Sequence, residues 1–338
     1  MSDETIDYLN RNTLIGYTVR RGTAWHYRKG TNNHYPGPIP VEDVKSRLFD
    51  WEPISTPVSA VLDDGTVITD HRRQALLRPD TEEILGVFKS TYTPHPYGQW
   101  LVDSVESILD TDLQIGSAGL LANGARAWVQ VEMQDTMQTE NVDFRPYLTA
   151  ATSMDGSLST TYQTGAQVVV CDNTLSLALR ETTSKYRVKH TRNSNIKISE
   201  ARDALRIMAA TASEVSARIE RLATTPVTTR QWTAFLDAYT APSSNSTRAN
   251  SNASDKRAQL ARLYDSDHRV APWAGTAWGV LSATNTWAHH YQAVRGTSRP
   301  ERNLDRMVQG QYAKIDNHTL HVLAKAASLD LSALDLAA

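Results

Sequence analysis

The stretch Gln167–Arg192, QVVVCDNTLSLALRETTSKYRVKHTR, decides the fold of this 338-residue chain. It contains the β-branched run Val168–Val170, which is typical of a central strand covered on both faces. A polar turn follows, in which Asp172 or Asn173 can cap the next helix. The stretch ends in a group of Lys and Arg residues. It therefore predicts a buried strand from which the chain passes to a charged surface.

Three hairpins are expected in the first half of the chain, each around an Asp-Gly or Asn-Gly turn. These dipeptides accept a positive φ at low cost and suit tight turns between twisted strands. The turns contain Asp64-Gly65, Asn123-Gly124 and Asp155-Gly156. The flanking strands are Val58–Leu62 with Val67–Thr69, Leu120–Leu121 with Ala127–Val131, and Tyr147–Thr152 with Leu158–Tyr162.

The second half changes to helical periodicity. Apolar residues repeat at spacings of three and four between Ala201 and Leu222, which predicts a long amphipathic helix from an N-cap at Ser199 to about Ala223. The other expected helices are Val41–Phe49, Gln99–Leu109, Thr229–Tyr239, Lys256–Tyr264, Ala277–Val294 and Asn317–Ala327. This order predicts an α+β fold: an antiparallel β-hairpin meander sheet packed with a long helix, followed by a helical C-terminal part.

The segment Pro242–Ser254, PSSNSTRANSNAS, divides the expected domains because it lacks large apolar side chains. Such a segment cannot offset its ordering entropy by burial, so we expect a flexible loop. The predicted organisation is an α+β core domain over residues 1–240, a Ser/Asn-rich flexible loop over 241–254, and a helical part over 255–338.

Composition excludes several classes of protein. A single cysteine, Cys171, excludes an internal disulfide framework and a thiolate-cluster metal site. The N-terminal residues lack the basic and apolar regions of a signal peptide, and no apolar run reaches the roughly 18–20 residues that span a bilayer. We expect a cytoplasmic protein without membrane contact.

Charge is distributed unequally along the chain. Residues 1–160 contain 13 Lys/Arg and 22 Asp/Glu, a net charge of −9, whereas residues 161–338 contain 22 and 15, a net charge of +7, which together give −2. An anionic partner would therefore contact the second half. Alternatively, the two halves neutralise each other across an interface within or between subunits.

Several blocks resemble a phage- and plasmid-borne family, domain of unknown function 932. The blocks are RGTAWHY (Arg21–Tyr27), GVFKSTYTPHPYGQ (Gly86–Gln99), SAGLLANGARAWVQVEM (Ser117–Met133), TSMDGSLSTTYQTGAQVVVCDNTLSLAL (Thr152–Leu179), KHT (Lys189–Thr191) and GTAWGVLSATNTWAHH (Gly275–His290). The chain departs from the family pattern at Gln167, where many members carry Arg. The resemblance implies a phage or plasmid setting, often near replication and recombination functions, and no established reaction or cofactor.

A basic cluster is the candidate functional site. Lys185–Lys197 contains five cations and no acid. The candidate nucleic-acid-binding residues are Lys185, Tyr186, Arg187, Lys189, Arg192 and Lys197. In a strand, alternate residues share one face at about 6.6–6.8 Å, close enough to the phosphate repeat of an extended single strand to follow it. The competing interpretation is an edge strand that lysines protect against aggregation.

Other candidates for catalysis or metal binding receive structural interpretations. Cys171 with His190 as its base would make a nucleophile, but a lone Cys after three valines is typical of a buried small residue. His318 and His321 share a helical face without a third ligand, so we expect no metal. No nucleotide-binding or hydrolase motif is present, which favours a non-enzymatic protein without a cofactor.

The eight tryptophans are expected to serve mainly in the core or in subunit contacts. The core interpretation applies to Trp25, Trp51, Trp100, Trp128 and Trp232. The remaining three, Trp273, Trp278 and Trp287, could form an interface or a platform for base stacking.

The leading functional hypothesis is a phage or plasmid protein that binds single-stranded DNA by its backbone, leaving the bases free for annealing in recombination or replication. Annealing proteins assemble as rings or filaments, so we also expect a homo-oligomer. The alternative is a protein-interaction module, for example in counter-defence or phage assembly, without nucleic-acid binding. An enzyme whose site has no linear signature is a third interpretation.

Overall fold

The computed structural model describes residues 10–21, 27, 29–106, 108–109, 113–133, 137–138, 143–168, 174–175, 185–188, 190, 216–268, 270–297 and 299–330. The chain forms two compact units. Unit 1 comprises Met1–Gln134, Tyr147–Thr164 and Thr182–Met208, and unit 2 comprises Asp135–Pro146, Gly165–Glu181 and Ala209–Ala338. The expected division at residue 240 differs, because the helix Thr229–Tyr239 packs in the core of the C-terminal helices.

The main sheet has the strand order β1-β5-β6-β8-β9-β10, and β7 pairs with β8 and β11 with β9. These strands are β1 (Thr13–Ile15), β5 (Leu113–Leu121), β6 (Arg126–Met133), β7 (Met137–Gln138), β8 (Asp143–Ser153), β9 (Thr160–Val168), β10 (Thr174–Leu175) and β11 (Lys185–Val188). The expected hairpins β5–β6 and β8–β9 are both present. Of the expected central strand Val168–Val170, β9 includes Val168, and the other two residues lie outside the described residues.

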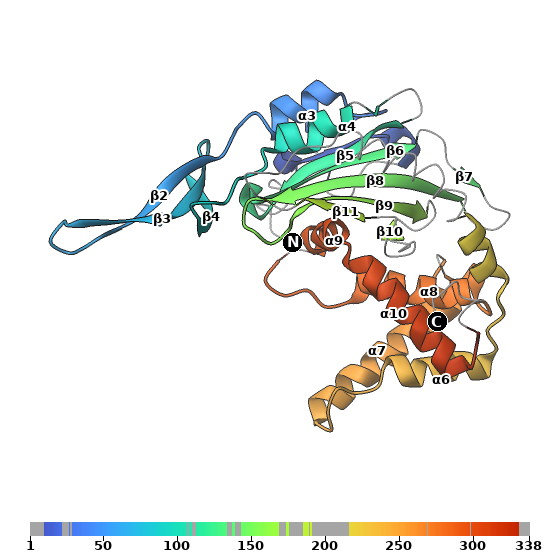
Figure 1. Ribbon diagram of the computed structural model, residues 1–338. Coiled ribbons are helices and arrows are strands. Elements are labelled where there is room, and N and C mark those ends of the chain that lie inside the picture. Colours follow the sequence, from blue (N-terminus) through green and yellow to red (C-terminus); the bar gives the residue numbers. More distant parts are fainter. Residues whose placement is uncertain are drawn as a thin grey trace. The chain divides into compact units, whose positions relative to one another are not determined.

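Short helices cover one face of this sheet in unit 1 (Figure 1). They are α3 (Val41–Leu48), the π-helix η1 (Gly98–Asp103) and α4 (Ser104–Glu106). Alternating residues of β6 face them, since Ala127, Val129 and Val131 are fully buried in the same cluster as Leu101 and Val102. The other face of β6 is buried as well, since Trp128, Gln130 and Glu132 are 0%, 4% and 1% exposed. A further short helix, α2 (Thr18–Arg21), follows β1.

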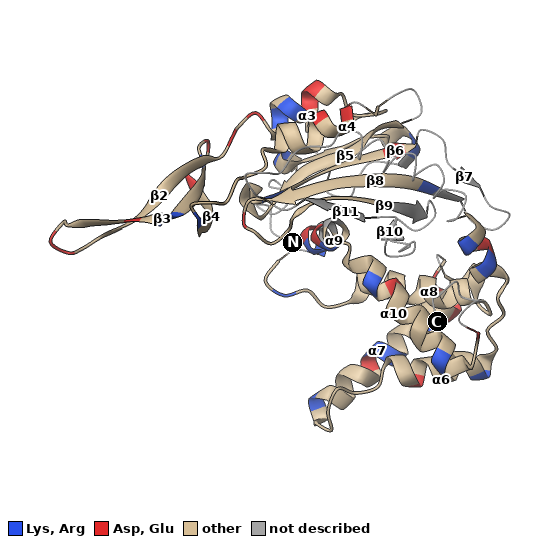
Figure 2. Ribbon diagram, viewed as in Figure 1, with Lys and Arg blue, Asp and Glu red and all other residues tan. Residues whose placement is uncertain are grey.

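A second sheet in unit 1 has the order β2-β3-β4 and is antiparallel throughout. It consists of β2 (Ile54–Val61), β3 (Val67–Arg78) and β4 (Glu83–Lys89). The inner part joins the core through Leu76 and Leu85, which are 0% and 7% exposed. The outer halves of β2 and β3 extend away from the other strands of unit 1, and the turn at their end is acidic (Figures 1 and 2).

Turn chemistry explains the hairpins. The β5–β6 connection, η2 (Ala122–Gly124), has positive φ at all three residues, 49°, 55° and 93°. Gly65 and Gly156 also have positive φ, 84° and 75°, in the other two predicted turns. In the first of these turns the Asp64 carboxylate accepts a hydrogen bond from the Thr66 amide at 2.9 Å.

Unit 2 contains the helices of the C-terminal part, of which η3 and α9 were not predicted. They are α6 (Thr229–Tyr239), α7 (Thr247–Ser266), η3 (Ala271–Trp273), α8 (Ala277–Thr286), the π-helix η4 (Trp287–Tyr291), α9 (Arg299–Val308) and α10 (Gln311–Ala327). The long helix expected from Ser199 to Ala223 is described only over residues 216–224, which are helical. Ile219 and Leu222 pack there with Phe235, Trp278 and Leu320 in one core.

Residues 247–254 differ from the expected flexible loop, because α7 begins at Thr247. The Ser246 hydroxyl accepts a hydrogen bond from the Ala249 amide at 3.2 Å and caps the helix. These residues bury no large apolar side chain, as expected, but the helix continues to Leu260, Leu263 and Tyr264, which are buried. Burial late in α7 therefore stabilises a helix whose first turns are solvated.

Within the described residues, no helix combines the length and the apolar character needed to cross a bilayer.

Candidate functional site

The structure places part of the predicted basic site in an edge strand. Over Lys185–Val188, β11 pairs antiparallel with β9, with Lys185 opposite Gln163 and Arg187 opposite Thr161. Among the described residues β11 pairs with no other strand. The prediction that Lys185 and Arg187 alternate along a strand is therefore met by the backbone. Lys189, Arg192 and Lys197 lie outside the described residues.

The register with β9 sets which residues lie opposite Tyr186 and its two basic neighbours. Position 186 lies opposite Tyr162, whose hydroxyl donates a 2.6 Å hydrogen bond to the Trp100 carbonyl within the core of unit 1. Since successive residues of a strand alternate between its two sides, positions 185 and 187 lie on the other side. Along the backbone of β11, position 186 therefore alternates with positions 185 and 187.

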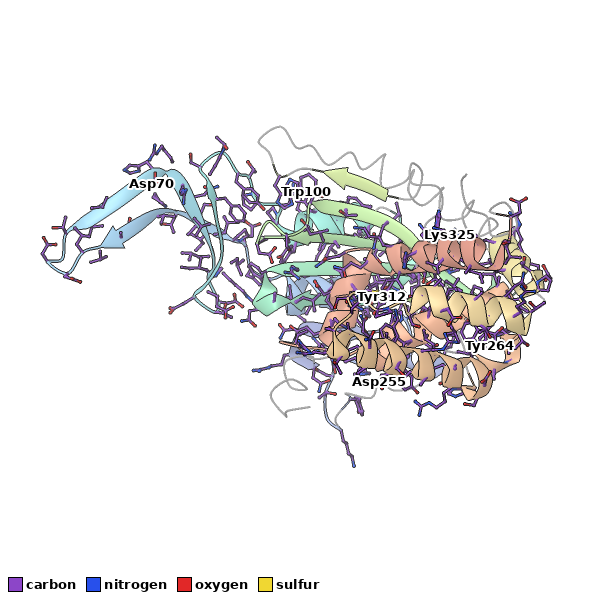
Figure 3. All side chains as sticks on the ribbon, turned by 90° about the horizontal axis from the view of Figure 1, so that it is seen from below. Asp70, Trp100, Asp255, Tyr264, Tyr312 and Lys325 are labelled. Carbon is purple, nitrogen blue, oxygen red and sulfur yellow. The ribbon has the colours of Figure 1, made fainter. Side chains whose placement is uncertain are left out.

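Two residues beyond β11, His190 enters a column of aromatic rings that the sequence did not reveal. Its ring stacks on that of His95 with 4.0 Å between centroids, and His95 stacks on Trp100 at 3.6 Å. On the other side His190 lies 5.2 Å from Tyr92, which stacks on Phe88 at 4.0 Å. Trp100 belongs to η1 and is labelled in Figure 3.

Hydroxyl groups of two strands bind the edges of these imidazoles. His95 Nδ1 lies 2.6 Å from Thr160 Oγ1, which is 2.7 Å from Thr152 Oγ1. His190 Nε2 lies 3.1 Å from the Thr152 hydroxyl, and His190 Nδ1 lies 2.5 Å from the Tyr92 hydroxyl. The hydrogen bonds therefore connect β8, β9, the segment after β4 and the segment after β11.

Burial sets the protonation state of the column. Desolvation, with a smaller contribution from His190, lowers the pKa of His95 to about 3. Desolvation lowers the pKa of His190 to about 4, and it raises the pKa of the Tyr92 hydroxyl. At neutral pH both imidazoles are uncharged and the phenol is protonated.

The arrangement is suited to holding chain segments together. Among the described residues neither imidazole is hydrogen-bonded to a carboxylate, and His95 Nε2 has no hydrogen-bond partner. A general base needs a partner that orients it and a proton within reach. Cys171, the candidate nucleophile for His190, lies outside the described residues.

The sequence contained a signal for this column. Tyr92 and His95 belong to the block Gly86–Gln99, and His190 belongs to the block Lys189–Thr191. Both blocks carry the resemblance to the family, but nothing in the linear sequence indicates that they meet across nearly 100 residues.

A second group of cations lies in unit 2 and binds backbone carbonyl groups. Arg299 and Arg302 donate to the Gln292 carbonyl, each at 3.1 Å, and Arg302 donates to the Ala288 carbonyl at 2.8 Å. Arg306 donates to the Gln292 side chain at 2.6 Å. These contacts satisfy the carbonyl groups left open at the end of η4. The three arginines are therefore engaged within the protein.

The sequence also suggested candidate metal ligands and tryptophans, and the structure describes most of these residues. Among the described residues no group of three or more His, Cys, Asp or Glu side chains could hold a metal ion. Trp51, Trp100, Trp128 and Trp232 are buried, which confirms the core prediction for these four. Trp25 lies outside the described residues. Trp278 is 2% exposed, so it is not available for base stacking.

Comparison with known proteins gives one match. A family model described as "Domain of unknown function (DUF932)" matches residues 84–309, about two thirds of the chain. The matched range includes Tyr92, His95, His190 and β11. No curated protein and no solved structure matches the chain.

Proposed function

The chain belongs to the DUF932 family, a family of unknown function, and on this premise we propose that it binds single-stranded nucleic acid through the phosphate backbone. The contact surface is β11 together with the basic residues that follow it, Lys189, Arg192 and Lys197. The biological role is annealing of phage or plasmid DNA in the cytoplasm of a bacterial host.

The observation that carries the proposal is the position of Lys185 and Arg187 in an edge strand. Their Cα atoms are two residues apart on one side of β11, a spacing of about 6.6–6.8 Å. A row of cations at this spacing can neutralise successive phosphates of an extended strand. The His190 column supports the proposal because it connects the end of β11 to three other segments, β8, β9 and the segment after β4.

The alternation of residues along β11 favours recognition of phosphates over stacking of bases. In a strand, position 186 alternates with positions 185 and 187, so a row formed by positions 185 and 187 does not include position 186. Contact with the backbone alone is independent of base sequence and leaves the bases available for pairing. This is the property that an annealing protein requires.

Salt dependence of binding tests the proposal directly. If five cations each neutralise one phosphate, the affinity for a single-stranded oligonucleotide falls by roughly 100-fold between about 50 and about 200 mM salt. The measurement is a fluorescence-anisotropy titration of labelled oligonucleotides, single- and double-stranded. An affinity that does not change with salt would contradict phosphate binding.

A charge-reversal variant locates the site. Changing Lys185, Arg187 and Lys189 to Glu should abolish the gel shift. The matched control changes three exposed cations of unit 2, Arg248→Glu, Lys314→Glu and Lys325→Glu, and so alters net charge equally; Lys325 extends from α10 in Figure 3. Equal loss in both variants would indicate that net charge, and not β11, determines binding.

The alternative function, a protein-interaction module, is favoured by the exposed apolar residues of the second sheet, among them Val61 and Ile84 at 71% and 66% exposure. It predicts recovery of one host or phage protein in stoichiometric amount and no retardation of DNA. Retardation that the β11 variant abolishes would select the nucleic-acid function.

A further inference from the structure

The outer half of the β2–β3 hairpin exposes apolar side chains on both of its sides. Val61 and Val67 form one cross-strand pair, and they are 71% and 59% exposed. Ile68, opposite Ala60 on the other side, is 56% exposed, and Leu62 is 46% exposed. A two-stranded hairpin is marginally stable in water by itself. Pairing of this hairpin with a further strand would cover apolar side chains that no other described residue of unit 1 covers.

The two edges of this outer hairpin differ in charge. The part of β3 in this outer hairpin contains Asp70, His71 and Arg72, and the Arg72 side chain is 93% exposed, whereas from Arg73 onward β3 pairs with β4. The edge formed by β2, from Ile54 to Leu62, contains no charged residue. Charged residues are a common protection of a sheet edge against pairing with another chain. Only the β2 edge lacks this protection.

We propose that two copies of this chain associate by antiparallel pairing of their β2 edges around Ala60. The pairing joins Val58–Leu62 of one copy to the same residues of the other and makes a continuous sheet across a two-fold axis. A two-fold contact uses the same surface on both copies, which an uncharged, self-complementary edge provides. This association goes beyond nucleic-acid binding and does not depend on it.

Charge selects the antiparallel direction. Asp63 and Asp64 are exposed at the end of the hairpin, whereas Arg72 and Arg73 lie in a bulge of β3 between its outer and inner halves. Antiparallel pairing places the acidic turn of each copy beside the part of the other copy's hairpin that contains the bulge with Arg72 and Arg73. Parallel pairing would place two acidic turns side by side, where like charges repel.

Charge and the bulge also select the register. With Ala60 opposite Ala60, Asp63 and Asp64 lie opposite the uncharged residues Pro57 and Thr56. A shift that places Val58 opposite Val58 would bring Asp64 opposite Glu52, an unfavourable pair. The Ala60 register also pairs Val58 with Leu62 of the second copy, so apolar side chains meet on one side of the new sheet.

A lysine at the centre of the contact provides the test. Ala60→Lys places two ammonium groups opposite each other, so the mass in solution should fall from twice the 37.5 kDa of one chain to that of one chain. Ala60→Glu should have the same effect. An equimolar mixture of the two variants should restore the dimer, because opposite charges then face each other. Ile84→Lys, at an exposed position of β4, should leave the dimer intact.

A cross-link tests the register without relying on loss of association. Directly opposed residues of antiparallel strands have Cα atoms about 4.5–5.5 Å apart, within the range that a disulfide bridges. Mild oxidation of Ala60→Cys should therefore give a covalent dimer, whereas Ile84→Cys, which retains the same Cys171, should not.

Three results would overturn the proposal. One is a wild-type chain that is monomeric at every concentration measured by light scattering. Another is an Ala60→Lys variant, folded by circular dichroism, that keeps the mass of the wild type. The third is a monomeric chain whose β2 edge binds a different protein. Loss of the dimer with unchanged oligonucleotide binding would support self-pairing and leave nucleic-acid binding as a separate property.

Discussion

Unit 1 and unit 2 both bury histidines, but the hydrogen bonds of these histidines extend over very different distances along the chain. In unit 1, His95 bonds to Thr160 and stacks on His190, so one column joins segments that are far apart in sequence. In unit 2, His289 Nδ1 donates to the Asn285 carbonyl four residues earlier at 2.9 Å, and its ring stacks on Tyr312 at 3.8 Å. The first arrangement closes long loops, whereas the second stabilises a helix end and its neighbour.

This difference shows which parts of the chain each buried histidine ring holds in place. The His289 contact with Asn285 forms as soon as the helix forms. The His190 contacts form only when β8, β9 and the segment after β4 have assembled, and they then fix the residue two positions after β11. We therefore expect substitutions in the unit 1 column to alter the proposed binding strand, and substitutions in unit 2 to alter stability alone.

The largest effect is expected for His95→Ala. The ring is 1% exposed and lies between Trp100 and His190, so its loss should lower the free energy of unfolding by about 3–5 kcal/mol, as for other buried rings. Oligonucleotide affinity should fall as well. His289→Ala, the matched change in unit 2, should destabilise the protein without altering affinity. Urea unfolding and anisotropy titrations measure the two quantities, and equal affinity losses in both variants would refute the distinction.

Acid should destabilise the protein through three buried histidines, of which two lie in unit 1 and one lies in unit 2. The pKa is lowered by burial to about 3 in His95, about 4 in His190 and about 3 in His289. The unfolded chain, with histidine pKa values of about 6.5, binds more protons, so this contribution to stability is present above pH about 6.5 and is lost as pH falls toward about 4. Each histidine contributes a slope of up to about 1.4 kcal/mol per pH unit.

Substitution separates the contributions to this slope. His95→Gln should reduce the difference between the urea midpoints at acidic and neutral pH, and His289→Gln should reduce it by a similar amount. A pH dependence that neither substitution changes would show that other groups control acid unfolding.

A smaller effect is expected for Tyr92→Phe. It removes the hydroxyl bonded to His190 but keeps the stack on Phe88, so the cost should be about 1–2 kcal/mol. Because the bond holds the residue after β11, oligonucleotide affinity should also decrease. Tyr312→Phe, which removes a 2.9 Å bond to Asn303 in unit 2, is the matched control and should leave affinity unchanged. An unchanged affinity in both variants would separate the column from binding.

The smallest effect is expected for Ser246→Ala at the start of α7. Loss of one capping hydrogen bond to the Ala249 amide should cost about 0.5–1 kcal/mol. The change should reduce helical signal in circular dichroism without affecting the unit 1 column. A loss of several kcal/mol would indicate that the first turns of α7 contribute more than their solvated side chains suggest.

Much of the fold was predictable because it rests on local chemistry. The Asp-Gly and Asn-Gly turns give the three hairpins, and the capped helix Thr229–Tyr239 has the predicted bounds, with Thr228 and Gln231 bonded reciprocally. The α+β class follows from the change of hydrophobic period along the chain. Residues 247–254 were predicted as a loop because their composition shows that they have no large apolar side chain to bury. They form a helix because Ser246 caps it and because residues further along α7 are buried.

The candidate site was predictable only in part. Residues 185–188 were expected in a strand from their alternating charges, and the structure describes that strand. The β9 residues that lie opposite positions 185–188 depend on the register, which sequence spacing does not specify. Arg302 illustrates the same limit, since its charge suggests a binding surface and its contacts with Ala288 and Gln292 make it a structural residue.

The sequence by itself determined the turns, the helix and strand periods, the family and the absence of charge from Ile54 to Leu62, because each can be read from the order of the residues alone. Only the tertiary structure decided that Tyr92, His95 and His190 meet and that Arg299, Arg302 and Arg306 cap a helix end. The physical reason is that the contacts of His190 join segments distant in the chain, and the arginine contacts, although they span only 7 to 14 residues, depend on how α9 lies against the end of η4. Their geometry depends on how the sheets and helices pack, and one residue of register decides which side chains share a face.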